Sequence, residues 1–111
     1  MSQQGLNEQE IIERSGNLNL CKAVLSYSKN ALVENNIVMT EVQWLSFVSH
    51  ISGMIYRSTY KEALPPIERE IFSEVSQDSI VLASAICQQM NHLQDDEKYL
   101  LSIHFEAAKL N

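Results

Sequence analysis

The sequence predicts an all-α protein, a compact bundle of five or six helices. Apolar residues recur at helical spacing in several long segments, whereas no segment alternates apolar and polar residues between the turns that a sheet requires. The 111 residues suit one domain, and 45% hydrophobic content with three glycines and two prolines indicates a folded chain. We expect a partly helical N-terminal extension over residues 1–16 and one helical domain over residues 17–111.

The first two helices are predicted from their end signals. Residues before about Asn7 are polar, and we expect them to be frayed. Asn7 with Glu10 three positions later forms a capping-box pattern, and Gly16 is typical of a helix stop. Asn17 then suits the N-cap of a second, amphipathic helix that extends to about Glu34.

A clearer capping box opens the third predicted helix. Thr40 and Gln43 carry this pattern, and the apolar residues that follow keep a helical period to about Tyr60. Two prolines then interrupt the pattern. Because proline is tolerated in the first turn of a helix, we expect a further helix from about Pro66 to Val75.

Two helices complete the predicted bundle. Asp78 can cap a helix that is apolar on nearly all sides, and such a helix belongs in the middle of a bundle. Asp95 and Asp96 favour the start of the final helix, because carboxylates stabilise helix N-termini. The residues expected on the inward face of this final helix are Leu100, Ile103, His104 and Ala107.

Charge and the N-terminal sequence limit the possible partners. Fourteen acidic against eight basic residues give a net charge of −6, which disfavours direct binding to nucleic acid or to a membrane surface. The chain shows neither a signal-peptide pattern nor eighteen consecutive apolar residues. We therefore expect a cytoplasmic protein that binds other proteins.

The sequence offers no motif for catalysis or for a cofactor. Cys21 and Cys87 lie in apolar helical patterns without a CxxC spacing, which indicates free, buried thiols. No nucleophile elbow, glycine-rich phosphate loop or zinc-ligand spacing occurs. We expect no enzymatic activity, no cofactor and no metal.

His50 is the first candidate functional residue. One helical turn before and after it lie the small residues Ser46 and Gly53, which would leave open space above the imidazole. Glycine inside a helix costs about 0.5–1 kcal/mol relative to alanine, so something other than helix propensity accounts for Gly53. The alternative explanation is a close helix–helix contact at that position.

Each of two histidines has a charged residue seven positions away on its own helix. Arg57 follows His50, and its guanidinium suits a phosphorylated imidazole, although it could also be a solvated arginine. Glu97 precedes His104, where a carboxylate could tune the imidazole or simply occupy the first turn. Taken alone, His104 could be a packed core histidine. His92 lies near a predicted helix end among polar residues, so we expect its side chain to be exposed to solvent and assign it no role.

These residues resemble the PTS regulation domain, an all-helical family found in bacterial antiterminators and transcriptional activators. The resemblance is carried by Val48-Ser49-His50-Ile51 followed by Arg57, and by the stretch from Glu97 to Phe105 that contains His104. It covers roughly Asn17 to Leu110. Two histidines in this order, each with a companion at seven residues, make the match moderately specific.

The resemblance implies regulation by phosphorylation. Histidines at the positions of His50 and His104 accept phosphoryl groups from the phosphocarrier protein or from sugar-specific components of the sugar phosphotransferase system, and such domains form homodimers. Arg57 would then stabilise a phosphate on His50, and Glu97 would orient or tune the acceptor site. Ser49 departs from the family, which often has an acidic residue there.

Two other interpretations stay open. Regulators of this family normally join two such domains to an RNA-binding or DNA-binding module, whereas the sequence predicts one domain. A helical scaffold, or a partner subunit of a metabolic or transport complex whose histidines are not phosphorylated, would fit this and Ser49. A small helical enzyme or metalloprotein built on His50, His92 and His104 is the least favoured interpretation.

Overall fold

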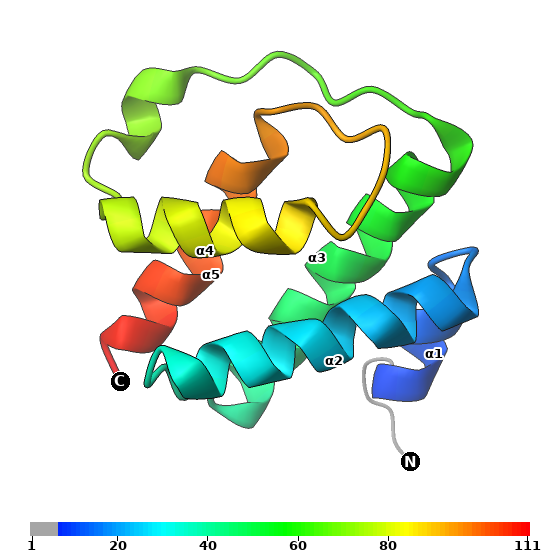
Figure 1. Cartoon of the computed structure of the whole chain (residues 1–111), viewed down its shortest axis with the longest axis horizontal. Helices are drawn as coiled ribbons and strands as arrows, with labels where there is room; N and C mark the ends of the chain where they lie inside the picture. Colours follow the sequence, from blue (N-terminus) through cyan, green and yellow to red (C-terminus); the bar gives the residue numbers. More distant parts are fainter. Residues whose placement is uncertain (1–6) are drawn as a thin grey trace.

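The computed structural model describes residues 7–111, and over this range the protein is all-α, as predicted (Figure 1). The five α-helices and one short 3-10 helix are α1 (Glu8–Glu13), α2 (Leu18–Glu34), α3 (Glu41–Tyr60), η1 (Arg69–Phe72), α4 (Gln77–Cys87) and α5 (Glu97–Lys109). The expectation for residues before Asn7 falls outside the described range. None of the helices described is long and apolar enough to span a bilayer.

The predicted start signals of the first three helices are confirmed. Asn7 and Glu10 form a reciprocal capping box at α1, and Thr40 and Gln43 form another at α3. The Asn17 side chain accepts a hydrogen bond from the backbone N–H of the third residue of α2. These caps satisfy backbone donors that have no partner within the helix, which fixes where each helix begins.

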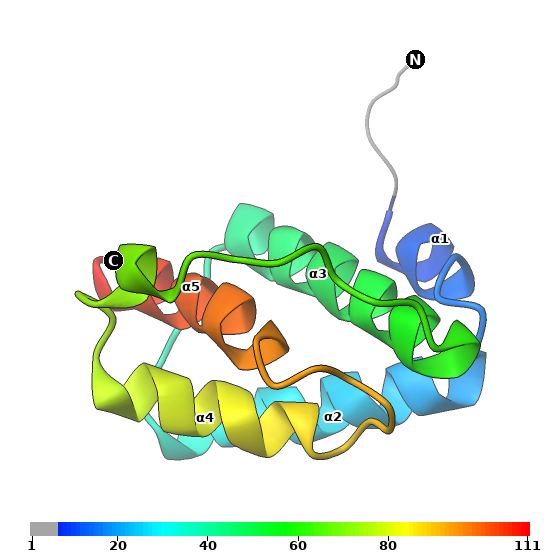
Figure 2. The same cartoon turned by 90° about the horizontal axis from the view of Figure 1, so that it is seen from above.

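The helices form two layers, with α2 and α4 in one and α1, α3 and α5 in the other (Figure 2). Helix α3 packs against α1, α2 and α5 and is the central element of the bundle. The prediction that α4 lies in the middle is wrong, because Val81 on this helix is 57% exposed. The fully buried side chains that α3 and α5 supply to the core are Phe47, Val48, Ile51, Met54, Ile55, Leu101 and Phe105.

Helix α1 lies in the segment predicted as a partly helical extension, and it packs on the core. Ile11 and Ile12 belong to the same buried cluster as the residues of α3. Ser52 Oγ donates a hydrogen bond to the Ile11 carbonyl, and Trp44 Nε1 donates to Glu8. Two side chains of α3 therefore hold α1 in place.

The segment after the two prolines differs from the prediction. In place of a helix from Pro66 to Val75, only Arg69–Phe72 forms a 3-10 turn. Phe72 is buried, but Ile71 is 70% exposed, so the segment has too few apolar contacts to support an α-helix. Helix α4 also begins differently: Ser76, not Asp78, is the N-cap residue and accepts from the Ser79 N–H.

The predicted inward face of α5 is wrong, although the helix itself begins after Asp96 as expected. Ile103 is 47% exposed and Ala107 is also exposed. Apolar residues lie on more than one side of this helix, and the side that carries the large Phe105 ring is the one that packs inward. The residues buried on α5 are Glu97, Leu101, Ser102, Phe105 and Ala108.

Candidate functional site

Helices α3 and α5 bring the four predicted site residues together in two pairs. Nδ1 of His50 lies 2.9 Å from Nε2 of His104, and Arg57 forms an ion pair with Glu97. His50 precedes Arg57 by seven residues on α3, whereas His104 follows Glu97 by seven on α5. Equal spacings in opposite order place both contacts in register across two antiparallel helices.

The two imidazoles form a partly buried, hydrogen-bonded pair. Their ring centroids are 5.0 Å apart, and the Phe47 ring lies edge-on to His104 at 5.8 Å. Burial lowers the pKa of His50 to about 4, and the charges of His104 and Arg57 add to this effect. Burial also lowers the pKa of His104. Both rings are therefore neutral at pH 7, and one donates the shared hydrogen bond to the other.

Arg57 is held in one orientation by Glu97. Its Nε and Nη2 atoms donate to the two carboxylate oxygens at 2.8 Å each, and Glu97 is only 1% exposed. The hydrogen bond with Glu97 is the largest cause of the raised pKa of Arg57. Both oxygens of Glu97 are thus engaged by arginine, and Nη1 of Arg57 is the guanidinium nitrogen outside this pair.

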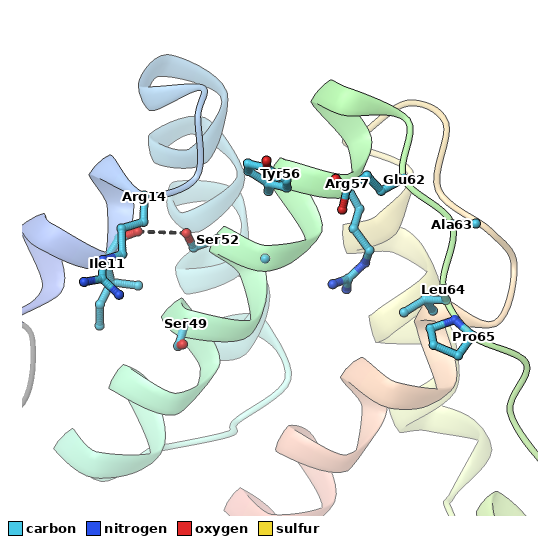
Figure 3. Close-up of a pocket in the computed structure, with 11 residues that line it drawn as sticks. Ile11, Arg14, Ser49, Ser52, Tyr56, Arg57, Glu62, Ala63, Leu64 and Pro65 are labelled. Atoms are coloured by element: carbon cyan, nitrogen blue, oxygen red, sulfur yellow. Dashed lines mark hydrogen bonds between the residues drawn. The ribbon is translucent and has the colours of Figure 1, made fainter.

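A cavity of about 500 Å³ lies beside Arg57, between α1, α3 and the segment that follows α3 (Figure 3). The guanidinium of Arg57 points into it, and Arg14 lies across from it at the end of α1 (Figure 3). Ser49 and Ser52 contribute hydroxyl groups from α3. The remaining lining residues are Ile11, Gly53, Tyr56, Glu62, Ala63, Leu64 and Pro65.

Gly53 lies at this cavity and not at a close helix–helix contact. A Cβ atom added there would have Arg57 Nη1 as its neighbour, at 3.6 Å, which is an ordinary contact. The alternative explanation of Gly53 as a close-packing residue is therefore wrong. The open space predicted beside His50 exists at Gly53, whereas His104 covers one ring nitrogen of His50 itself.

The remaining predicted residues lie as follows. Ser46 is exposed, and so is His92, which lies in the turn between α4 and α5 with a φ of 64°. Cys21 is fully buried and Cys87 partly buried; both are free thiols, and burial raises the pKa of Cys87 to about 12. Within residues 7–111, no three His, Cys, Asp or Glu side chains gather closely enough to hold a metal ion.

Two features of this site were not predicted from the sequence. One is Arg14, which lies directly after the short helix α1, 43 positions before Arg57, and gives no local signal of its role in the cavity wall. The other is the direct bond between the histidines. The matching seven-residue spacings in opposite order are compatible with two antiparallel helices in contact, but they do not by themselves show that the two helices meet.

Comparison with solved structures identifies a chain that is similar over the whole length. A PRD-containing transcription regulator from Lactobacillus casei ATCC 334 superposes on this protein with a TM-score of 0.88. The two sequences are 34% identical, and the match covers 98% of this chain and 97% of the other. No protein-family model and no curated protein sequence matches the chain.

Proposed function

The chain belongs to the family of the PTS regulation domain (PRD). We therefore propose that it is a phosphorylation-responsive regulatory module of the bacterial sugar phosphotransferase system. In this proposal, His50 and His104 form the acceptor site for phosphoryl groups from the phosphocarrier protein or a sugar-specific component. The module acts in the cytoplasm and takes part in transcription regulation, as the name of the similar Lactobacillus casei protein suggests.

The contact between His50 and His104 carries this proposal. An imidazole accepts a phosphoryl group through the lone pair of an unprotonated nitrogen, so it must be neutral. Partial burial keeps both rings neutral at pH 7 through their lowered pKa values. The helix pair therefore holds two neutral imidazole rings at one place on the bundle.

Arg57 supports the proposal by supplying a fixed positive charge near His50. A phosphoryl group adds close to two negative charges at pH 7, and guanidinium is the preferred partner for its oxygens. Nε and Nη2 of Arg57 are engaged by Glu97, which leaves Nη1 for a phosphate. In this proposal the role of Glu97 is to orient Arg57, and through it to tune the acceptor site.

The regulatory output is a change in protein association. With a net charge of −6, the chain is unsuited to bind nucleic acid directly, so its effect on transcription passes through a protein partner or a second copy of itself. Added phosphate charge near a helix interface either recruits a cation or repels a neighbour. Sedimentation of the phosphorylated and unphosphorylated protein would measure the shift between monomer and homodimer.

Reconstitution with phosphoenolpyruvate, enzyme I and the phosphocarrier protein tests the proposal. Intact mass at neutral pH should show a gain of one or more phosphoryl groups that disappears when the phosphocarrier protein is omitted. His50→Ala and His104→Ala then identify which histidine is needed. A folded wild-type protein that gains no mass, with sugar-specific components also tried, would contradict the proposal.

One observation favours a second candidate, the helical scaffold that is not phosphorylated. His50 and His104 already satisfy each other through a hydrogen bond, as packed histidines do in a structural role. If the protein is such a scaffold, His50→Ala and His104→Ala would each lower the free energy of unfolding. The wild-type protein itself would then show no donor-dependent gain of mass.

A further inference from the structure

The hydrogen bond between His50 and His104 limits which nitrogen can act as a nucleophile. A neutral imidazole carries one N–H and one lone pair, and each ring here uses one nitrogen in the shared bond. The ring that donates keeps the lone pair on its other nitrogen free. The ring that accepts has its proton on its other nitrogen, so it has no free lone pair. The pair therefore presents one nucleophilic nitrogen at a time.

Two arrangements of the shared proton are possible, and they expose different atoms. If Nδ1 of His50 donates to His104, then Nε2 of His50 has the free lone pair. If Nε2 of His104 donates to His50, then Nδ1 of His104 has it. The accessible nucleophile is thus either the outer ring nitrogen of His50 or the inner ring nitrogen of His104.

Ring geometry and charge both favour the first arrangement. Nδ1 is bonded to the ring carbon that joins the side chain, so on His104 it lies close to the backbone of α5, where a phosphoryl group is crowded. Nε2 of His50 lies at the outer end of its ring. In addition, Arg57 lies close enough to lower the pKa of His50 through its charge, and Arg57 is the cation that a phosphate needs.

Resting on the function proposed above, we propose that Nε2 of His50 takes the phosphoryl group and that His104 is the positioning residue that accepts the proton from Nδ1 of His50. The Nε2 lone pair forms the new N–P bond. The N–P bond of the donor phosphohistidine breaks, and its nitrogen keeps the electron pair and takes up one proton. The proton on Nδ1 of His50 moves to Nε2 of His104, and His104 releases its own Nδ1 proton to water, so protons balance.

The same geometry restricts the pair to one phosphoryl group. The two rings lie 5.0 Å apart between centroids, and a second group would place a further charge of nearly two beside the first. Arg57 is the cation beside the pair, and Glu97 already engages two of its nitrogens. A second phosphoryl group would also require the crowded Nδ1 of His104.

The first test is the tautomer of the unphosphorylated protein, read by nitrogen-15 NMR of the histidine rings at neutral pH. The proposal predicts a proton on Nδ1 of both rings, with Nε2 of both unprotonated. His104→Gln, whose amide oxygen can still accept from His50, should keep the His50 tautomer, whereas His104→Ala should not. A proton on Nε2 of His50 in the wild-type protein would overturn the inference, whether or not the protein is a phosphoryl acceptor.

The second test locates the phosphoryl group after complete reaction with phosphoenolpyruvate, enzyme I and the phosphocarrier protein. We expect one group, on Nε2 of His50, and none in His50→Asn, whose amide occupies the Nδ1 position. His104→Gln should load the same atom at least about tenfold more slowly, because it cannot take up the proton. Two groups on the wild-type protein, or one on His104, would overturn the inference while leaving the proposed function intact. No group on the wild-type protein would overturn the proposed function itself.

Discussion

Arg57 and Glu97 form a two-point ion pair across α3 and α5, with both nitrogen–oxygen distances at 2.8 Å. Glu97 is almost fully buried, whereas Arg57 keeps 22% of its side chain exposed. The carboxylate is therefore the partner that depends on the pair, because it has the smaller access to water. The pair also joins the two helices that carry the histidines, so it couples the stability of the bundle to the geometry of the site.

Arg57→Ala should lower the free energy of unfolding by about 3–5 kcal/mol, since it leaves the buried Glu97 carboxylate without its partner. Glu97→Gln should cost less, because the amide keeps a hydrogen-bond acceptor and the partly exposed arginine can reach water. Denaturant unfolding at pH 7 measures both. Arg69→Ala is the matched control: its pair with Asp96 lies at the surface, where water screens the charges, so its loss should cost much less than the loss of Arg57. Equal losses for Arg57→Ala and Arg69→Ala would contradict this account.

Stability should fall as the pH is lowered from about 6.5 toward 4. The folded-state pKa of His50 is about 4, below its ordinary value of 6.5, so in this range the unfolded chain binds a proton that the folded protein does not. The contribution of His50 to the free energy of unfolding is fully present above pH 6.5 and is lost as the pH falls toward 4. The slope of this loss is up to about 1.4 kcal/mol per pH unit. Denaturant unfolding at several pH values measures the slope.

Two comparisons keep the pH prediction specific. His50→Asn should reduce the slope between pH 6.5 and 5, and the slope that is left should come from His104, whose pKa burial also lowers. Glu106 titrates in a lower window, because its hydrogen bond from Ser79 is the largest cause of a pKa lowered to about 2. The contribution of Glu106 to stability is present above pH 4.5, the ordinary pKa of a glutamate, and is lost as the pH falls toward 2. A slope above pH 5 that is as steep in His50→Asn as in the wild-type protein would assign the effect to groups other than His50.

Gly53→Ala should stabilise the protein by about 0.5–1 kcal/mol through helix propensity, because the new Cβ meets only an ordinary contact with Arg57. Gly16→Ala is the contrasting variant. Gly16 has a φ of +80°, and a Cβ there would lie 2.9 Å from the Tyr60 ring, so we expect destabilisation. Thermal unfolding distinguishes the two directions. A destabilised Gly53→Ala would show that the space beside Arg57 is not free.

The fold class and the first three helices could be predicted because their signals are local. A capping box marks the start of a helix within four residues, as Asn7 with Glu10 and Thr40 with Gln43 do here. The helix expected after Pro66 did not form, because helix formation there depends on burial, and Ile71 faces solvent. Sequence periodicity cannot tell which apolar residues find a neighbouring surface.

The sequence pointed to the residues of the candidate site, but not to which of them contact each other. Seven-residue spacing singled out four residues, and the structure brings these four together across α3 and α5. It paired Arg57 with His50 and Glu97 with His104 along each helix, whereas the structure joins histidine to histidine and arginine to glutamate between helices. Contacts along one helix follow from the period, but contacts between helices depend on their relative direction and register, which no local pattern encodes.

The central claim is that the histidine pair accepts a phosphoryl group, and intact mass after reaction with phosphoenolpyruvate, enzyme I and the phosphocarrier protein tests it most directly. We predict a phosphocarrier-dependent mass gain in the wild-type protein and in His92→Ala, and none in the double variant His50→Ala with His104→Ala. Circular dichroism would establish that the double variant is folded. A gain that persists in the folded double variant, or a wild-type protein that gains no mass, would contradict the claim.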